Sequence, residues 1–267
     1  MHLPKFTYPP VIESVLSVQF ARLKNYSSAQ GGWFWKQQLN GAGEWPKTSI
    51  APKLLDQFER FDGDALWAQF PIINIPAVSE RLQIVSSDEQ RMIQLQDNRF
   101  AFNWRKQGDS GYPSFDSLYP EFIKYFSAFS QFAKDLEGAD LEINQWEITY
   151  VNNIEKGQLW DSVSDWNSII PAISIPKAFN SNVESVHSEW RHVIGDKRGR
   201  LYISAAHARV GVASAESLLL QLVARGPIDK ERGFTLEDGF KLGHEVIVKT
   251  FADITSERAH KLWQRKS

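Results

Sequence analysis

The spacing of apolar residues changes several times along the chain and predicts an alternation of strands and helices. Alternating and β-branched runs are typical of strands. Five such runs occur in the first half, at residues 11–20, 65–70, 81–85, 91–95 and 99–105. Aromatic and leucine side chains gathered in residues 28–40 predict a short helix after the first of these strands.

After Pro113 the apolar period lengthens from two residues to three or four. Apolar side chains recur at this spacing from Leu118 to Leu136, which predicts a long amphipathic helix. We expect Ser114 or Ser117 to cap the start of this helix and Gly138 to end it.

The second half follows the same order of elements. A strand is predicted at residues 141–154 and a helix at residues 159–170. Three further strands follow at residues 189–194, 200–209 and 217–224, and a turn at residues 195–199 joins the first two as a hairpin.

The C-terminal region carries the clearest helix signals of the sequence. Thr235 and Asp238 have the spacing of a capping box, and an apolar stripe continues behind them to Ile254. Thr255 is expected to cap one last short helix that contains Leu262 and Trp263.

These elements predict an α+β fold built from two similar halves, residues 1–138 and 139–267. Each half is expected to be an antiparallel sheet covered by a long helix, and a chain of 267 residues is long enough for two such units. The order of the elements resembles that of the duplicated TATA-binding-protein-like fold.

Composition and charge exclude several classes of protein. Apolar residues make up 42% and charged residues 23%, as in an ordinary globular protein, and the net charge of −2 argues against a dedicated nucleic-acid binder. The absence of cysteine excludes disulfides, thiolate metal sites and cysteine nucleophiles. The sequence shows no signal peptide and no apolar run of transmembrane length, so we expect a cytoplasmic protein without a membrane partner.

The motifs of known catalytic and cofactor sites do not occur in this sequence. The six histidines lack the His-x-x-x-His and His-x-x-Glu spacings that place two ligands on one face of a helix. Neither a nucleophile elbow, a P-loop nor a dinucleotide-binding glycine fingerprint occurs. We therefore expect no metal, no cofactor and no catalytic residue.

Several motifs together resemble a sporadically distributed family of bacterial proteins of about this length, which has no established activity. The matching segments are Pro9-Pro10-Val11-Ile12-Glu13, the strand from Gln96 to Arg105, Tyr112-Pro113, Tyr150-Val151-Asn152 and the helix from Gly243-His244-Glu245 to Thr255. The resemblance covers almost the whole chain. The patchy distribution of the family implies a role in systems such as phage defence or toxin–antitoxin loci.

Glu13 is a candidate site residue because it interrupts an otherwise apolar strand. If its carboxylate is buried, it needs a partner such as Arg99 or Arg105, and the alternative is that it faces solvent. Asn103, Arg105 and Asn152 stand near strand ends, where they could hydrogen-bond a ligand or simply end the strands.

A second group of candidates lies in the basic hairpin. Arg198 and Arg200 carry charge near Trp190 and Tyr202, a pattern that could hold a phosphate backbone while a ring stacks on a base. The alternative is a solvated hairpin tip, since exposed loops usually carry charge.

Taken together, the residues favour a non-enzymatic binding or interaction protein with a protein partner. One alternative is an enzyme or sensor for a nucleotide or another phosphorylated small molecule, with Arg105 as phosphate clamp and Glu13 or His244 transferring a proton. The other alternative is an accessory protein that binds nucleic acid.

Overall fold

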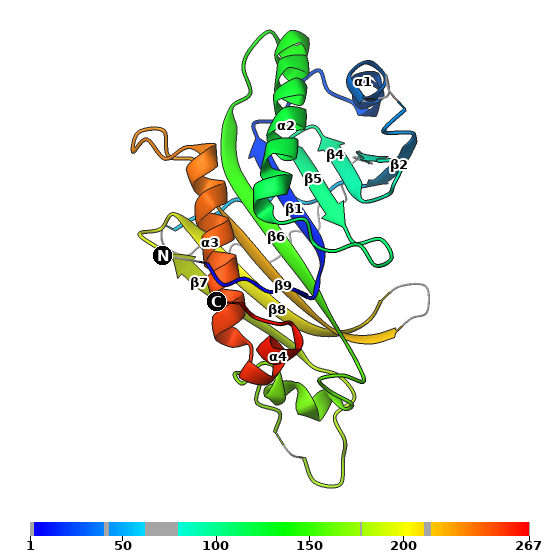
Figure 1. Ribbon diagram of the computed structural model, residues 1–267. Helices are drawn as coiled ribbons and strands as arrows, with labels where there is room; N and C mark the ends of the chain where they lie inside the picture. Colours follow the sequence, from blue (N-terminus) through cyan, green and yellow to red (C-terminus); the bar gives the residue numbers. More distant parts are fainter. Residues whose placement is uncertain (1–2, 40–42, 62–79, 177, 211–214, 267) are drawn as a thin grey trace.

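The described residues form one antiparallel sheet of nine strands, and the two long helices lie on one of its faces (Figure 1). The computed structural model describes residues 3–39, 43–61, 80–176, 178–210 and 215–266. In the sheet, the strands follow one another in the order β2-β3-β4-β5-β1-β6-β9-β8-β7.

The strands are β1 (Val11–Phe20), β2 (Lys47–Pro52), β3 (Glu80–Val85), β4 (Arg91–Gln96), β5 (Arg99–Arg105), β6 (Ile143–Glu155), β7 (His187–Ile194), β8 (Gly199–Val210) and β9 (Ala215–Pro227). The α-helices are α1 (Ser28–Phe34), α2 (Phe115–Glu137), α3 (Leu236–Ile254) and α4 (Glu257–Leu262). A π-helical turn, η1 (Trp35–Leu39), extends α1, and a 3-10 helix, η3 (Val163–Ser168), follows β6.

The prediction of two halves, each with its own sheet, is wrong, although the mixture of helices and strands is right. β1 and β6, the first strands of the two predicted halves, pair antiparallel from Glu13 opposite Val151 to Gln19 opposite Gln145. Their backbone groups satisfy each other at the centre of the sheet, so one ladder of hydrogen bonds crosses the whole molecule.

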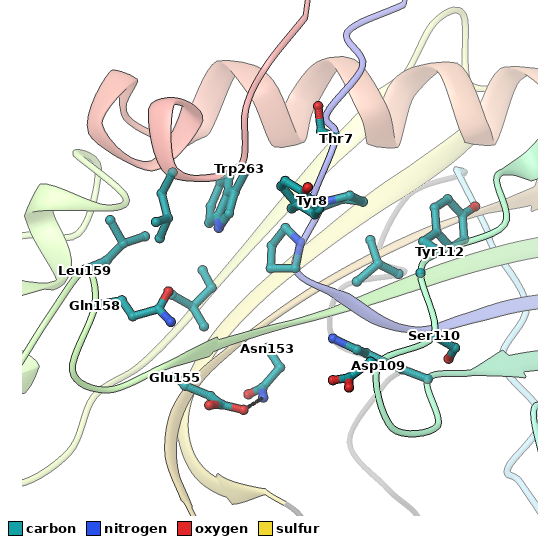
Figure 2. Close-up of a pocket in the computed structure, with 17 residues that line it drawn as sticks. Thr7, Tyr8, Asp109, Ser110, Tyr112, Asn153, Glu155, Gln158, Leu159 and Trp263 are labelled. Atoms are coloured by element: carbon teal, nitrogen blue, oxygen red, sulfur yellow. Dashed lines mark hydrogen bonds between the residues drawn. The ribbon is translucent and has the colours of Figure 1, made fainter.

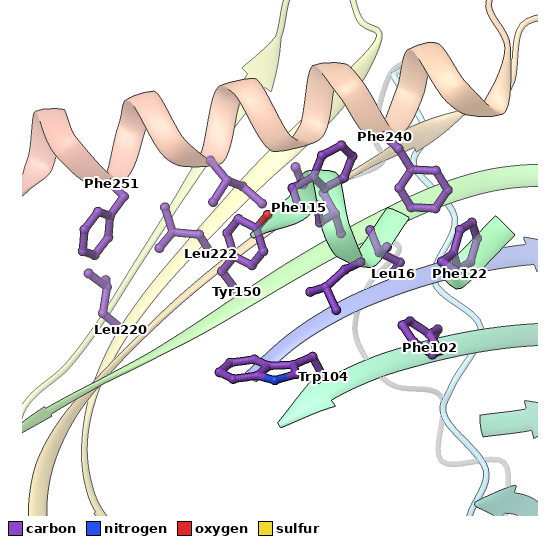
Figure 3. Packing of buried hydrophobic residues seen from close by; sticks show 14 of the residues in the cluster. Leu16, Phe102, Trp104, Phe115, Phe122, Tyr150, Leu220, Leu222, Phe240 and Phe251 are labelled. Atoms are coloured by element: carbon purple, nitrogen blue, oxygen red, sulfur yellow. The ribbon is translucent and has the colours of Figure 1, made fainter. Parts of the chain in front are cut away.

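Side chains of consecutive strand residues point to opposite faces, and the two faces of this sheet differ sharply. On β1, Leu16 and Val18 lie under the helices, while Ser17 and Gln19 point to the other face. Figure 3 shows the apolar side chains that pack between the sheet and α3. We call the opposite face, which neither long helix covers, the open face.

The helix α2 fills the core with phenylalanine rings. Phe122 and Phe129 are fully buried, and Phe122 packs edge-to-face on Phe240 of α3 at 4.9 Å between ring centroids. Gly138 ends the helix in a left-handed conformation with φ of 74°, as predicted. Ser114 stands at the N-cap position, but its side chain makes no capping hydrogen bond.

The helix α3 lies unusually close to the sheet because two glycines face β6. A Cβ atom built on Gly239 would lie 2.4 Å from the Trp146 ring, and one built on Gly243 would lie 2.6 Å from it. The predicted capping box is confirmed, since Thr235 and Asp238 each bond the other's backbone amide.

Three local predictions need correction. Within residues 159–170 the structure has only the short 3-10 helix η3, which begins at the capping box of Ser162 and Asp165. The last helix, α4, is capped by Ser256 rather than Thr255, whose hydroxyl instead donates to the Phe251 carbonyl at 2.6 Å. The edge strand β2 was not predicted because nearly all of it is exposed. The strand predicted at residues 65–70 lies outside the described residues.

Across the described part of the chain, no helix is both long enough and apolar enough to cross a membrane.

Alanine substitutions at Phe251 and Lys249 test which face of α3 is buried. Phe251 is 7% exposed and packs on Trp263 at 5.2 Å, so Phe251→Ala should lower the free energy of unfolding by about 3–5 kcal/mol. Lys249, which pairs with Glu245 on the outer side, is the matched control, and Lys249→Ala should cost well under ~1 kcal/mol. Denaturant melts with equal midpoints for the two variants would contradict this assignment.

Candidate functional site

The open face of the sheet is lined by polar side chains and is hollowed at its centre. Ser17 and Ala101 lie opposite each other on β1 and β5, and their small side chains leave room between the longer ones around them. The resulting cavity has a volume of about 340 Å³. We call it the open-face pocket.

Polar side chains from six strands line the open-face pocket. They are Glu13, Ser17, Arg81, Gln83, Gln94, Arg99, Asn103, Glu147, Thr149 and Gln221. Several of them are buried, and Ser17, Asn103 and Arg99 are at most 5% exposed. A concentration of buried polar groups of this kind is costly unless it serves as a binding site or is fully hydrogen-bonded.

A segment without regular structure, residues 53–61, runs across the open face beside the pocket, and we call it the strap. Side chains of the sheet hold its backbone in place of strand pairing. The Gln96 side chain bonds both the amide and the carbonyl of Leu54, at 3.1 and 3.3 Å. The Gln57 carbonyl accepts hydrogen bonds from Gln19 at 3.1 Å and Gln145 at 2.6 Å.

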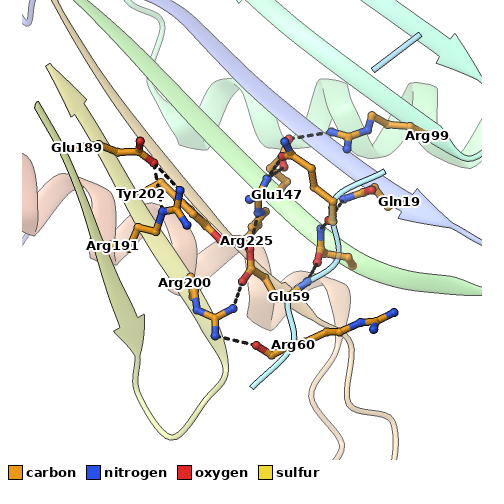
Figure 4. A network of polar contacts seen from close by, with 12 residues as sticks. Gln19, Glu59, Arg60, Arg99, Glu147, Glu189, Arg191, Arg200, Tyr202 and Arg225 are labelled. Atoms are coloured by element: carbon orange, nitrogen blue, oxygen red, sulfur yellow. Dashed lines mark hydrogen bonds and ion pairs between the residues drawn. The ribbon is translucent and has the colours of Figure 1, made fainter. Parts of the chain in front are cut away.

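Glu59 anchors the strap through a buried carboxylate. Its side chain is 1% exposed and accepts hydrogen bonds from Arg225 at 2.6 Å, Tyr202 at 2.7 Å and Arg200 (Figure 4). Burial raises the pKa of Glu59, but the hydrogen bonds from these three residues outweigh burial and hold the pKa below its usual value. The carboxylate is therefore charged at neutral pH.

Ion pairs connect this anchor with the pocket. Arg225 also contacts Glu147 at 3.4 Å, and Glu147 in turn pairs with Arg99 at 2.9 Å (Figure 4). Arg99 is thus the end of a chain of alternating charges that runs from the strap to the pocket wall.

The guanidinium of Arg81, unlike that of Arg99, has no carboxylate partner among the described residues. Within the described residues its side chain makes no ion pair and no hydrogen bond, and burial and the nearby charge of Arg99 lower the pKa of Arg81. The Nε atoms of Arg81 and Arg99 and the hydroxyl of Ser17 are buried without a hydrogen-bond partner in this part of the chain. An anion is the partner that Arg81 lacks in the described part of the chain, and the free Nε of Arg99 could donate to the same anion.

Of the predicted site residues, the structure brings Glu13 and Asn103 together. Both line the pocket, and the Asn103 amide donates to the Glu13 carboxylate at 2.7 Å. Arg105 lies opposite Glu13 in the β1–β5 register, but its guanidinium approaches the Glu89 carbonyl at 3.5 Å, and its buried Nε has no partner among the described residues.

The other predicted residues lie elsewhere. Asn152 is 2% exposed and donates to the Leu220 carbonyl at 3.0 Å, which fixes the pairing of β6 with β9. Arg200 binds Glu59 of the strap, and exposed Arg198 lies over the Phe234 ring at 5.2 Å. The basic hairpin therefore directs Arg198 and Arg200 to intramolecular partners.

His244 is on the helix-covered face and does not share a site with Glu13. Its ring stacks on Phe115 at 4.3 Å, and its Nδ1 lies 2.9 Å from the hydroxyl of Tyr150. Burial lowers the pKa of His244 to about 4, so the ring is neutral at physiological pH.

The sequence prediction missed Arg81, Gln94, Glu147, Glu59 and Arg225. A signal for some of them was present, because residues 93–96 of β4 and residues 145–150 of β6 alternate between polar and apolar side chains. Gln145, Glu147 and Thr149 alternate with Trp146, Ile148 and Tyr150, which is the pattern of a sheet with one polar face. The strap could not be predicted in the same way, since side-chain hydrogen bonds and ion pairs, rather than strand pairing, hold it in place.

A second cavity, of about 450 Å³, lies between the start of β1, the loop after β5 and the C-terminal end (Figure 2). Tyr8 and Trp263 line it, together with the Pro9-Pro10 pair of the sequence motif. Asn153 and Glu155 in its wall hydrogen-bond each other at 3.2 Å. Its charged lining residues, Lys106, Asp109 and Glu155, do not include the predicted candidates.

Comparison of the sequence with models of known protein families gives no match, and comparison with curated proteins gives none either. The resemblance to the sporadically distributed bacterial family stays a prediction.

Removal of the Glu59 carboxylate should destabilise the protein strongly, because buried Arg225 and half-buried Arg200 would lose their shared counter-ion. We expect Glu59→Ala to lower the free energy of unfolding at pH 7 by about 3 kcal/mol. The stabilisation by Glu59 is present above its ordinary pKa and is lost as the pH falls through its lowered pKa, so the variant should respond less to acid below about pH 4.5.

Asp140→Ala is the control for Glu59→Ala, since Asp140 forms an ion pair with Lys134 at the surface, where its side chain is 83% exposed. Denaturant melts should show a loss within about 0.5 kcal/mol for this variant. A similar small loss for Glu59→Ala would show that Glu59 does not anchor the strap.

The buried neutral His244 should make the folded state sensitive to moderate acid. Between pH 6.5 and about 4 the unfolded chain binds a proton that folded His244 does not, so the free energy of unfolding should decrease as the pH falls through this window, by at most about 3 kcal/mol. His244→Asn keeps an acceptor near Tyr150 but cannot titrate, and its melts should depend less on pH. Burial also lowers the pKa of His260, but the titration of His260 affects the stability of the wild type and of His244→Asn alike. Parallel pH profiles for the two proteins would contradict the assignment.

Proposed function

We propose that the protein is a cytoplasmic binding protein of a bacterial system, and that its open-face pocket holds a small ligand with an anionic, phosphate-like group. The observation that carries this proposal is Arg81, a half-buried guanidinium beside Arg99 without a counter-ion among the described residues. Planar guanidinium groups bind phosphate oxygens through paired hydrogen bonds, and the unpartnered Nε atoms are donors for such a contact.

The dimensions and the lining support a small molecule as the ligand. A volume of about 340 Å³ lies within the range of ordinary ligand sites, and polar atoms converge on it from six strands. Many of the aromatic side chains that could have formed a docking platform instead pack in the core, although Tyr8, Trp33, Phe58 and Phe179 are exposed.

The hydrogen bonds and ion pairs of the two pocket carboxylates favour a binding role over a catalytic one. Glu13 accepts a hydrogen bond from Asn103, and Glu147 is held by Arg99 and Arg225. Both are thus fixed acceptors within hydrogen-bonded networks. The proposal includes a protein partner that recognises the ligand-bound form, for example in phage defence or a toxin–antitoxin system.

Thermal unfolding in the presence of ribose 5-phosphate tests the proposal. The midpoint temperature of unfolding of the wild-type protein should rise by about 5–10 °C when ribose 5-phosphate is present at a hundred times its Kd, because only the folded state binds it. Sodium chloride at equal ionic strength should not produce this rise.

Arg81→Ala should abolish the rise without harming the fold. Without ligand, the variant should melt at the wild-type temperature or above, since the substitution removes a half-buried charge that faces Arg99. Arg232→Ala is the control, because Arg232 is an exposed arginine far along the chain that pairs with Asp229. An equal response of Arg81→Ala and wild type, or no response of either, would overturn the proposal.

A further inference from the structure

A chain of side-chain hydrogen bonds crosses the open face and ends in the pocket. The Ser49 hydroxyl donates to Gln83 at 3.2 Å, and Gln83 donates to Gln94 at 3.2 Å. Gln94 then donates to Asn103 at 2.7 Å, and Asn103 donates to Glu13 at 2.7 Å. One residue from each of five adjacent strands takes part, and we call this chain the amide relay.

Glu13 fixes the direction of the whole relay. A carboxylate can only accept, so Asn103 must turn its NH2 group towards Glu13 and its carbonyl towards Gln94. The same argument orients Gln94 and Gln83 in turn. Because every bond points the same way, the bonds polarise one another and hold the Glu13 carboxylate in one position.

The second oxygen of Glu13 is available to a ligand. The Asn103 bond uses Oε1, and within the described residues Oε2 has no hydrogen-bond partner. Glu13 is half-buried and lines the pocket. A fixed carboxylate oxygen of this kind selects a ligand group that carries an N–H donor.

The strand register gives the separation between this acceptor and the arginines. Glu13 lies opposite Arg105, and Arg99 lies opposite Gln19, so the two positions are six residues apart along β1. Six residues along a strand span roughly 20 Å, and Arg99 shortens this distance by reaching Glu147, which lies opposite Ser17. The donor and the anion of the ligand must therefore lie far apart in the molecule, which excludes an α-amino acid, whose charged groups share one carbon.

We propose that the ligand is a nucleoside monophosphate whose base carries an exocyclic amino group, with the phosphate at Arg81 and Arg99 and the amino group donating to Glu13. This inference rests on the proposed function and adds the identity of the ligand class. The pocket volume of about 340 Å³ fits one nucleotide.

Isothermal titration with AMP, inosine 5′-monophosphate and ribose 5-phosphate tests the inference on the wild-type protein. AMP and inosine 5′-monophosphate differ at the exocyclic position, an amino donor in one and a carbonyl in the other. AMP should bind roughly 10- to 100-fold more tightly, because the carbonyl would face the Glu13 carboxylate without a proton between them. CMP and UMP form a second pair with the same difference, and at least one amino-bearing nucleotide should be preferred to its counterpart.

Glu13→Gln separates recognition of the base from recognition of the phosphate. The variant should lose the preference for the amino-bearing nucleotide and keep its affinity for ribose 5-phosphate, whereas Arg81→Ala should weaken all phosphorylated probes equally. Equal wild-type affinity within both nucleotide pairs would overturn the inference while Arg81-dependent binding of ribose 5-phosphate still supported the proposed function. Failure of every phosphorylated probe to bind would overturn the proposed function, and the inference with it. The wild-type comparison does not depend on the folding of any variant.

Discussion

The antiparallel pairing of β1 with β6 is the contact on which the rest of the structure depends. It joins the first and second parts of the chain into one sheet and fixes which side chains face the helices. A shift of this register by one residue would turn Ser17 and Gln19 into the core and Leu16 and Val18 out of it. The apolar contacts under α2 and α3 therefore also determine which polar groups meet on the open face.

The elements with a strong local signal could be predicted from the sequence. β1 and β5 were placed at their observed bounds, and α3 begins at the predicted capping box. The sheet arrangement could not be derived in this way, because strand propensity does not say which strand edges meet. A separate sheet in each half and one continuous sheet satisfy the same alternation of residues, and only long-range pairing distinguishes them.

Only those residues of the candidate site that carry a local signal in the sequence could be predicted. Glu13 was a candidate because it interrupts an apolar strand, and Asn103 because it stands near a strand end, and the two side chains meet in the open-face pocket. Glu59 and Arg225 come from segments far apart in the chain, and the strap brings them into contact, while Arg81 approaches Arg99 through the strand order. Asn152 was also a candidate because it stands near a strand end, but its side chain hydrogen-bonds the backbone of the neighbouring strand.

The close seating of α3 on Trp146 limits how this sequence can change. An alanine at Gly239 or Gly243 would collide with the indole, while a smaller residue at position 146 would leave a void beneath a helix that cannot fill it. Each single step is unfavourable, although an enlarged helix residue and a reduced strand residue could compensate each other. Evolution of this part of the fold must therefore pass through paired substitutions, and the glycines and the tryptophan should be inherited or replaced as a set.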